Sequence, residues 1–292
     1  MEGFLNSRVL MSTMKVIVED GIYHVTQRAP GNELIFIEDN DYLRFVSLLK
    51  ETVRKFQLEL FCFALLSNHL HLLLRIKEKN LSEAMRYLFK RYAQWFNVKY
   101  ERKGHVFCGA YRAALCCDDG HLLAASVYIH LNPLKAGLAK DIFKYKWTSL
   151  NCYIQQLKNP SFVRPEIVTK MLGEKGYLLY KKLMVDTIDL KYGNINEDRK
   201  AIKKFSDNFA GFIEKFIKKE LIGNNSLASF FKEEGMIKDF LKQKRKIGPE
   251  GNEGLLYSVS QLRARGYTFD EVAQRLKIGR STIYRLLMTQ KC

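Results

Sequence analysis

Residues 58–76 read LELFCFALLSNHLHLLLRI, two mostly apolar runs on either side of the polar pair Ser67 and Asn68. Runs of this length, rich in Leu and Phe and separated by turn-forming residues, are typical of adjacent β-strands. We therefore expect two strands, at residues 58–65 and 69–76, joined by a short turn.

Alternation along the second strand separates two kinds of side chain. Consecutive side chains on a strand point to opposite faces, so Leu70, Leu72 and Leu74 have the pattern of a buried face. His69 and His71 then share the other face, about 7 Å apart along the strand, close enough to bind one ion. The pattern also fits two hydrogen-bonded structural histidines, so the spacing alone leaves both interpretations open.

The flanking segments predict an α+β fold. Strand-like alternation and helical spacing of apolar residues predict further elements on both sides of the two strands. We expect strands at residues 22–28 and 110–116, and helices at 41–56, 81–100 and 120–131, the last ended by Asn132 and Pro133. This order predicts a ferredoxin-like, split βαβ antiparallel sheet with helices on one face.

The C-terminal residues predict a helix-turn-helix. Thr268 and Glu271 have the spacing of a capping box, and helices are expected at 269–276 and 280–287. Lys277 stands at the turn position that glycine usually occupies. An ordinary helical hairpin remains the alternative. In a helix-turn-helix, the second helix faces a major groove with Arg280, Ser281, Thr282, Tyr284 and Arg285.

Three regions are expected along the chain. Residues 15–150 hold the mixed strand and helix patterns, and residues 151–250 are mostly helical with Lys-rich faces. A Gly- and Pro-containing linker near residue 250 leads to the helix-turn-helix in residues 251–292.

Charge gives the first indication of a partner. The 292 residues include 48 Lys and Arg against 31 Asp and Glu, a net charge of +17, which favours a polyanionic partner over an inert basic surface. The longest apolar run, residues 60–66, is too short to cross a bilayer, so no membrane partner is expected. Without an export signal or a CxxC pair, we expect a cytoplasmic protein with reduced cysteines and no zinc site.

A tyrosine and an amide form the second candidate group. Tyr128 and Asn132 are four residues apart, so they share one face of a helix, whereas His130 faces elsewhere. The amide oxygen suits a hard cation beside a phenol nucleophile. The alternative is a packing tyrosine with Asn132 as a helix cap.

Taken together, the segments YHVTQR, SNHLHLLL, GHVFCGAYR, YIHLNPLKAGL and KWTS resemble the single-tyrosine HUH transposases, most closely the REP-associated tyrosine transposase branch. The resemblance covers residues 15–150. It implies that His69 and His71 bind a metal ion, that Tyr128 is the nucleophile, and that Asn132 completes the metal site. His24 belongs to the first motif and is either a residue that lines the site or a structural sheet histidine.

The resemblance implies an enzyme that cleaves and rejoins single-stranded or hairpin DNA through a 5′-phosphotyrosine intermediate, with Mg²⁺ or Mn²⁺ as cofactor. We expect a monomer or homodimer, with duplex DNA as a further ligand of the helix-turn-helix. The alternatives are a non-catalytic, sequence-specific DNA-binding regulator and, ranked third, a relaxase or rolling-circle initiator. Basic residues expected to contact DNA in the first region are Arg28, Arg86, Lys90, Arg91 and Arg112.

Overall fold

The computed structural model describes most of residues 17–188 and a C-terminal unit. The described residues are 17–31, 33–116, 119–155, 162–188 and 268–288, with the single positions 209, 212, 216, 255 and 259. Most of region 151–250 and the expected linker lie outside these residues, so the three domain boundaries stay predictions. No helix in the described ranges is long and apolar enough to cross a bilayer.

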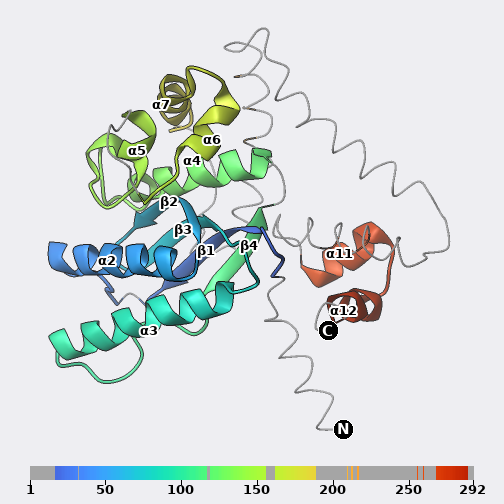
Figure 1. The fold of residues 1–292 in the computed structure, drawn as a ribbon, viewed down its shortest axis with the longest axis horizontal. Coiled ribbons are helices and arrows are strands. Elements are labelled where there is room, and N and C mark those ends of the chain that lie inside the picture. Colours follow the sequence, from blue (N-terminus) through green and yellow to red (C-terminus); the bar gives the residue numbers. More distant parts are fainter. Residues whose placement is uncertain are drawn as a thin grey trace.

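Four strands form one antiparallel sheet in the order β2-β3-β1-β4 (Figure 1). Helices follow β1 and β3, which is the arrangement of the ferredoxin-like fold, so the predicted α+β fold class is confirmed. The strands are β1 (Ile22–Arg28), β2 (Glu59–Leu65), β3 (His69–Arg75) and β4 (Arg112–Cys116).

Helices lie on both faces of this sheet (Figure 1). α2 (Asp39–Lys55) and α3 (Leu81–Lys99) cover one face, where Leu70, Leu72 and Leu74 are fully buried as predicted. The other face is covered by α4 (Asp119–Lys135), so the prediction that all helices share one face is wrong.

The position of α4 follows from the side chains on the second face of β2 and β3. Cys62, Ala64 and Leu73 make that face apolar as well, and all three are fully buried in a core with residues of α4. An apolar sheet face left in water would be unfavourable, so a helix packs on it.

The end of α4 differs from the prediction. The helix continues through Asn132 and Pro133, although Pro133 removes one backbone hydrogen bond. Helix burial outweighs this loss, because every residue from 120 to 133 is buried. The helix ends instead at Lys135, and the turn after it places Gly137 at a φ of 70°, with the neighbouring Leu138 donating back to the Pro133 carbonyl. Asn132 therefore stays in the helix, one turn after Tyr128.

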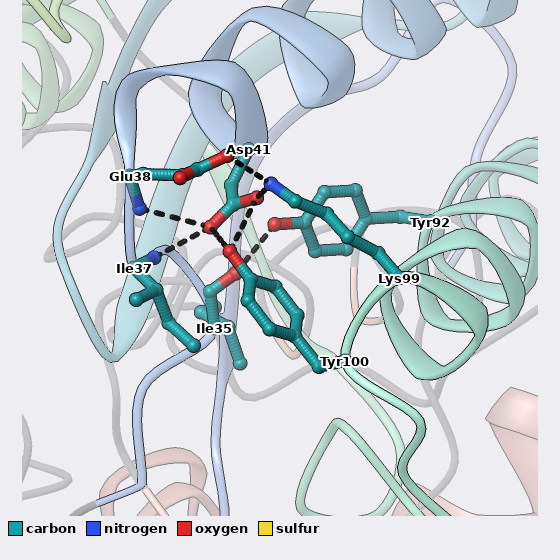
Figure 2. A network of polar contacts seen from close by, with 7 residues as sticks. All are labelled: Ile35, Ile37, Glu38, Asp41, Tyr92, Lys99 and Tyr100. Carbon is teal, nitrogen blue, oxygen red and sulfur yellow. Dashed lines mark hydrogen bonds and ion pairs between the residues drawn. The ribbon is translucent and has the colours of Figure 1, made fainter.

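A closed polar network joins α2 to the end of α3 (Figure 2). The Asp41 carboxylate is fully buried and accepts hydrogen bonds from the backbone N–H groups of Ile37 and Glu38, at 2.7 and 3.0 Å. Lys99 and the Tyr100 hydroxyl donate to the same carboxylate. Burial raises the pKa of Asp41, but these donors outweigh burial and hold the pKa below its ordinary value. The network fixes the two helices against each other on the face away from α4.

Five short helices complete the part of residues 142–188 that the structure describes. They pack beside and over α4 (Figure 1). They are η1 (Ile142–Lys144), α5 (Leu150–Ile154), α6 (Glu166–Thr169), η2 (Lys170–Leu172) and α7 (Gly176–Asp186).

Candidate active site

The two histidines of β3 lie side by side on the sheet face that α4 covers. His69 and His71 are both buried, and their ring centroids are 5.1 Å apart. Their cross-strand partners on β1 are Arg28 and Thr26, so these four side chains belong to one face. The alternation predicted from the sequence is therefore present.

His69 is oriented by the residue before it. Its Nδ1 lies 2.7 Å from Oδ1 of Asn68, and because this oxygen only accepts, the imidazole donates from Nδ1. The buried Nε2 is left with its lone pair and makes no hydrogen bond of ordinary geometry to any described residue. Burial lowers the pKa of His69 to about 4, so the ring is neutral at physiological pH.

His71 is bonded to a third histidine, His24 on β1. Nδ1 of His71 lies 3.0 Å from Nε2 of His24. In the described part of the chain, Nε2 of His71 and Nδ1 of His24 are buried without hydrogen-bond partners. Burial lowers the pKa of His71 well below its ordinary value and that of His24 to about 3, so both rings are neutral.

Tyr128 comes to these rings from α4. Its side chain is 3% exposed, and its ring centroid lies 6.3 Å from that of His24 and 6.0 Å from that of His71. Burial raises the pKa of Tyr128, and the nearby Asn132 side chain acts in the opposite direction. The Asn132 side chain also interacts with His69. This interaction raises the pKa of His69, whereas burial, the larger effect, lowers it. The structure thus brings Tyr128, Asn132, His69 and His71 together.

A cavity of about 160 Å³ lies over the part of the sheet next to the two histidines. Since about 10–15 Å³ of such space is enough for one water molecule, the cavity has room for a phosphate group or a hydrated ion. Two arginines give it a positive wall, which suits an anionic ligand. Its lining residues are Thr26, Gln27, Arg28, His69, His71, Cys108, Ala110 and Arg112.

Comparison with known proteins gives two family matches. Residues 18–132 match the family described as "Transposase IS200 like". The chain contains an IS200-like transposase domain. Residues 244–290 match the helix-turn-helix domain of resolvase. No curated protein matches the chain.

Several solved structures match this chain, and one of them illustrates the similarity. It is a REP-associated tyrosine transposase bound to a REP hairpin, at 14% sequence identity and a TM-score of 0.44. The match covers 50% of this chain and 87% of that one.

The basic residues predicted to contact DNA fall into two places in the transposase domain. Arg28 and Arg112 line the cavity beside the histidines. Arg86, Lys90 and Arg91 lie on α3, which covers the opposite face of the sheet. Arg91 is in an ion pair with Glu51 and contacts the Tyr87 hydroxyl, so part of its charge is already compensated. The structure does not bring the α3 residues to the histidines.

The C-terminal unit has the two predicted helices, α11 (Phe269–Leu276) and α12 (Arg280–Met288). Thr268 and Glu271 form the capping box, with the Glu271 N–H 3.2 Å from the Thr268 hydroxyl. Lys277 takes the left-handed conformation, with a φ of 51°, at the turn where glycine is usual.

The residues predicted to face DNA lie on α12, as expected. Arg280, Ser281 and Arg285 are exposed, and Thr282 and Tyr284 are partly buried. Arg280 bonds to Asp270 and to the Tyr284 hydroxyl, at 2.9 Å for each closest contact. Tyr284 also packs on Phe269, so it contributes to the small core of the unit.

Two residues near the site were not identified from the sequence. Asn68 orients His69, and its position directly before a strand histidine is a signal that the sequence offers. Gln27 has no such signal. It lines the cavity and donates to the Gly109 carbonyl at 3.1 Å, which ties β1 to the loop at the cavity rim.

Proposed function

We propose that this chain cleaves and rejoins single-stranded or hairpin DNA, with Tyr128 as the nucleophile and a 5′-phosphotyrosine intermediate. The observation that carries the proposal is the meeting of buried Tyr128 with two histidines, His69 and His71, whose Nε2 atoms make no hydrogen bond of ordinary geometry to a described residue and which line a cavity that also holds two arginines. The IS200-like transposase domain supports the same reaction class.

The donor set fits a divalent metal ion. The Nε2 atoms of His69 and His71 are buried and make no hydrogen bond of ordinary geometry to a described residue, and a buried polar atom in this state is costly unless a ligand satisfies it. Asn68 orients His69 through its other nitrogen, as is usual for metal-bound histidines. We propose that His69, His71 and the Asn132 amide oxygen hold Mg²⁺ or Mn²⁺. When bound, such an ion withdraws charge from the scissile phosphate.

Residues of the chain itself would bind the phosphate and stabilise the nucleophile. Arg28 and Arg112 hold the phosphate in the cavity, because a guanidinium pairs with phosphate oxygens in two-point geometry. Asn132 stabilises the phenolate of Tyr128, whose pKa burial alone raises. The Tyr128 phenol loses its proton, and attack by the phenolate oxygen forms a phosphotyrosyl ester and breaks the bond from phosphorus to the 3′-oxygen. The 3′-oxygen takes up one proton and leaves as a hydroxyl, so one proton is lost and one is gained. One ester replaces another, so the bond energy is kept for rejoining.

The test is formation of a covalent adduct. Full-length protein with single-stranded hairpin DNA and Mg²⁺ or Mn²⁺ should give a protein–DNA species that survives a denaturing gel. Tyr128→Phe removes the attacking oxygen with little change in volume and should bind DNA without forming the adduct. Tyr87→Phe, on the far face of the sheet, is the matched control and should form it normally. An adduct that persists in Tyr128→Phe would show that Tyr128 is not the nucleophile. An adduct that persists in the wild type with chelator would show that cleavage needs no metal ion.

The second candidate function is a non-catalytic, sequence-specific DNA-binding regulator. It is favoured by the helix-turn-helix, whose α12 presents Arg280, Ser281 and Arg285 to solvent. Arg280→Ala and Arg285→Ala should each weaken binding to a duplex carrying the recognised sequence, by about 1–3 kcal/mol if the side chain contacts a base. Under the enzyme proposal, both variants still form the Tyr128 adduct on single strands. Loss of duplex binding in a wild type that never forms an adduct would favour the regulator.

A further inference from the structure

His24 is a buried group that the proposed reaction leaves without a role. Its side chain is 1% exposed, and its ring lies beside both the His71 ring and the Tyr128 ring, with centroids 5.2 and 6.3 Å away. β1 is paired on both sides, with β3 and with β4, so His24 sits on a strand that is held firmly in place. Its neighbour on β4 is Ala114, a small side chain that leaves room for the imidazole.

The contact between His24 and His71 carries a single proton. Nε2 of His24 and Nδ1 of His71 face each other at 3.0 Å, so one of these two nitrogens donates and the other accepts. If His71 donates, its Nε2 is a bare lone pair. If His24 donates, the proton of His71 sits on Nε2 and closes that nitrogen to a cation. The direction of this one hydrogen bond therefore decides whether His71 can act as a ligand.

The surroundings favour donation by His71. Both arrangements leave one N–H and one lone pair unpaired, so the count of hydrogen bonds does not separate them. The electrostatics do, because His71 lines the cavity together with Arg28 and Arg112, whereas His24 does not. Positive charge at the cavity favours a lone pair directed toward it over an N–H group.

We propose that His24 is a positioning residue that accepts the Nδ1 proton of His71 and so keeps Nε2 of His71 unprotonated on the cavity side. His24 orients His71 through its Nδ1, just as Asn68 orients His69 through its Nδ1. The contact of His24 runs between two strands, whereas Asn68 directly precedes His69 in the chain. This role rests on the proposed metal-dependent function, since an open Nε2 matters only to a ligand that takes it.

The first test reads the proton directly in the metal-free, full-length protein. Nitrogen-15 NMR of labelled histidines distinguishes the two neutral forms of His71. We expect Nδ1–H in the wild type and in His24→Gln, whose amide oxygen can replace the accepting Nε2. In His24→Leu, which has no acceptor, His71 should lose its preference for Nδ1–H. A His71 ring protonated on Nε2 in the wild type overturns the proposal.

The second test measures Mn²⁺ affinity by titration calorimetry, without DNA or turnover. His24→Leu should weaken binding by about 10–100-fold, as is typical for loss of a group that orients a metal-bound histidine, and His24→Gln should restore it. Circular dichroism and urea unfolding verify that both variants fold. Wild-type affinity in His24→Leu, with affinity lost in His71→Ala, rejects the role of His24 and leaves the metal site standing. Unchanged affinity in both His69→Ala and His71→Ala rejects the metal site itself, while the NMR result still decides the direction of the hydrogen bond.

Discussion

Buried histidines on the α4 side of the sheet differ in how completely they are hydrogen-bonded, and His130 contrasts with the group of His24, His69 and His71. His130, on α4, has its Nδ1 2.8 Å from the Tyr180 hydroxyl and its Nε2 2.9 Å from the Ser149 hydroxyl. His24, His69 and His71 are buried to a similar degree, yet each keeps one nitrogen without a partner among the described residues.

The contrast separates structural histidines from candidate ligands. The hydroxyls around His130 are themselves bonded, since Tyr180 donates to Ser126 and Ser149 accepts the Phe63 N–H. Such a closed network ties α4 to β2 and α7 and needs no further ligand. In the other group the open nitrogens are a cost to folding, and a bound cation would remove it. Residue type and burial are the same, so the hydrogen bonds distinguish the two roles.

The largest effect is expected from a substitution among the histidines with a nitrogen unpartnered among the described residues, His24, His69 and His71, which we call the open group. His69→Leu removes a proposed ligand and should reduce adduct formation by more than about 100-fold. The free energy of unfolding should stay within about 1 kcal/mol of the wild type, or rise, because an unsatisfied buried nitrogen is lost with the ring. Denaturing gels and urea unfolding measure the two quantities. Strong destabilisation with normal cleavage would place His69 in the structural group.

Substitution of His130, whose two nitrogens are both hydrogen-bonded, should instead lower stability and leave adduct formation intact. His130→Leu leaves the Ser149 and Tyr180 hydroxyls without their shared partner, and should cost about 2–4 kcal/mol of unfolding free energy. Adduct formation by the folded fraction should persist, since His130 faces away from Tyr128. Tyr180→Phe, which removes one hydroxyl, is the milder control. A variant that is fully stable but inactive would show that His130 serves the chemistry.

The Asp41 network extends the comparison to the opposite face of the sheet. Its donors lower the pKa of Asp41 below the ordinary value of 3.8, so the ionised network stabilises the fold above that pH, and the contribution is lost as the pH falls below it. Asp41→Asn should therefore lower the unfolding free energy by about 1.5–3 kcal/mol at pH 7. The difference from the wild type should shrink near pH 3, and Mn²⁺ affinity should not change. Urea unfolding at both pH values checks the sign.

The smallest effect concerns the helix-turn-helix, where the strain is in the backbone. Lys277→Gly relieves a left-handed conformation and should stabilise this unit by about 1 kcal/mol. Thermal unfolding followed by circular dichroism measures the change, with Lys277→Ala as a control that keeps the strain. Duplex affinity should stay the same in both variants. A destabilised Lys277→Gly would mean that the lysine side chain, rather than its backbone, matters at the turn.

Prediction from the sequence was most successful where a short period decides the structure. β1 spans Ile22–Arg28 as expected, and β2 and β3 lie within one residue of their predicted limits, because alternation identifies a strand without tertiary information. The predicted end of α4 is wrong because Pro133 is a local signal against helix. Packing of the helix on two sides outweighs that signal.

The candidate site was predictable only in part. The spacing of His69 and His71 and of Tyr128 and Asn132 placed each pair on one face of its own element. Their meeting depends on α4 crossing the sheet on the histidine side, and the sequence had suggested the other face. His24 stayed ambiguous because its contact with His71 is diagonal across two strands, and only the register that pairs Thr26 with His71 shows it.

By itself, then, the sequence determined the elements, the ferredoxin-like order and the candidate residues, since all of these follow from local periodicity and motif spacing. Only the tertiary structure decided which histidines have open nitrogens and which are closed by hydroxyls from distant segments. The physical reason is that a hydrogen-bond partner is a matter of proximity in space. Ser149 and Tyr180 reach His130 from 19 and 50 residues away, and His24 reaches His71 from 47.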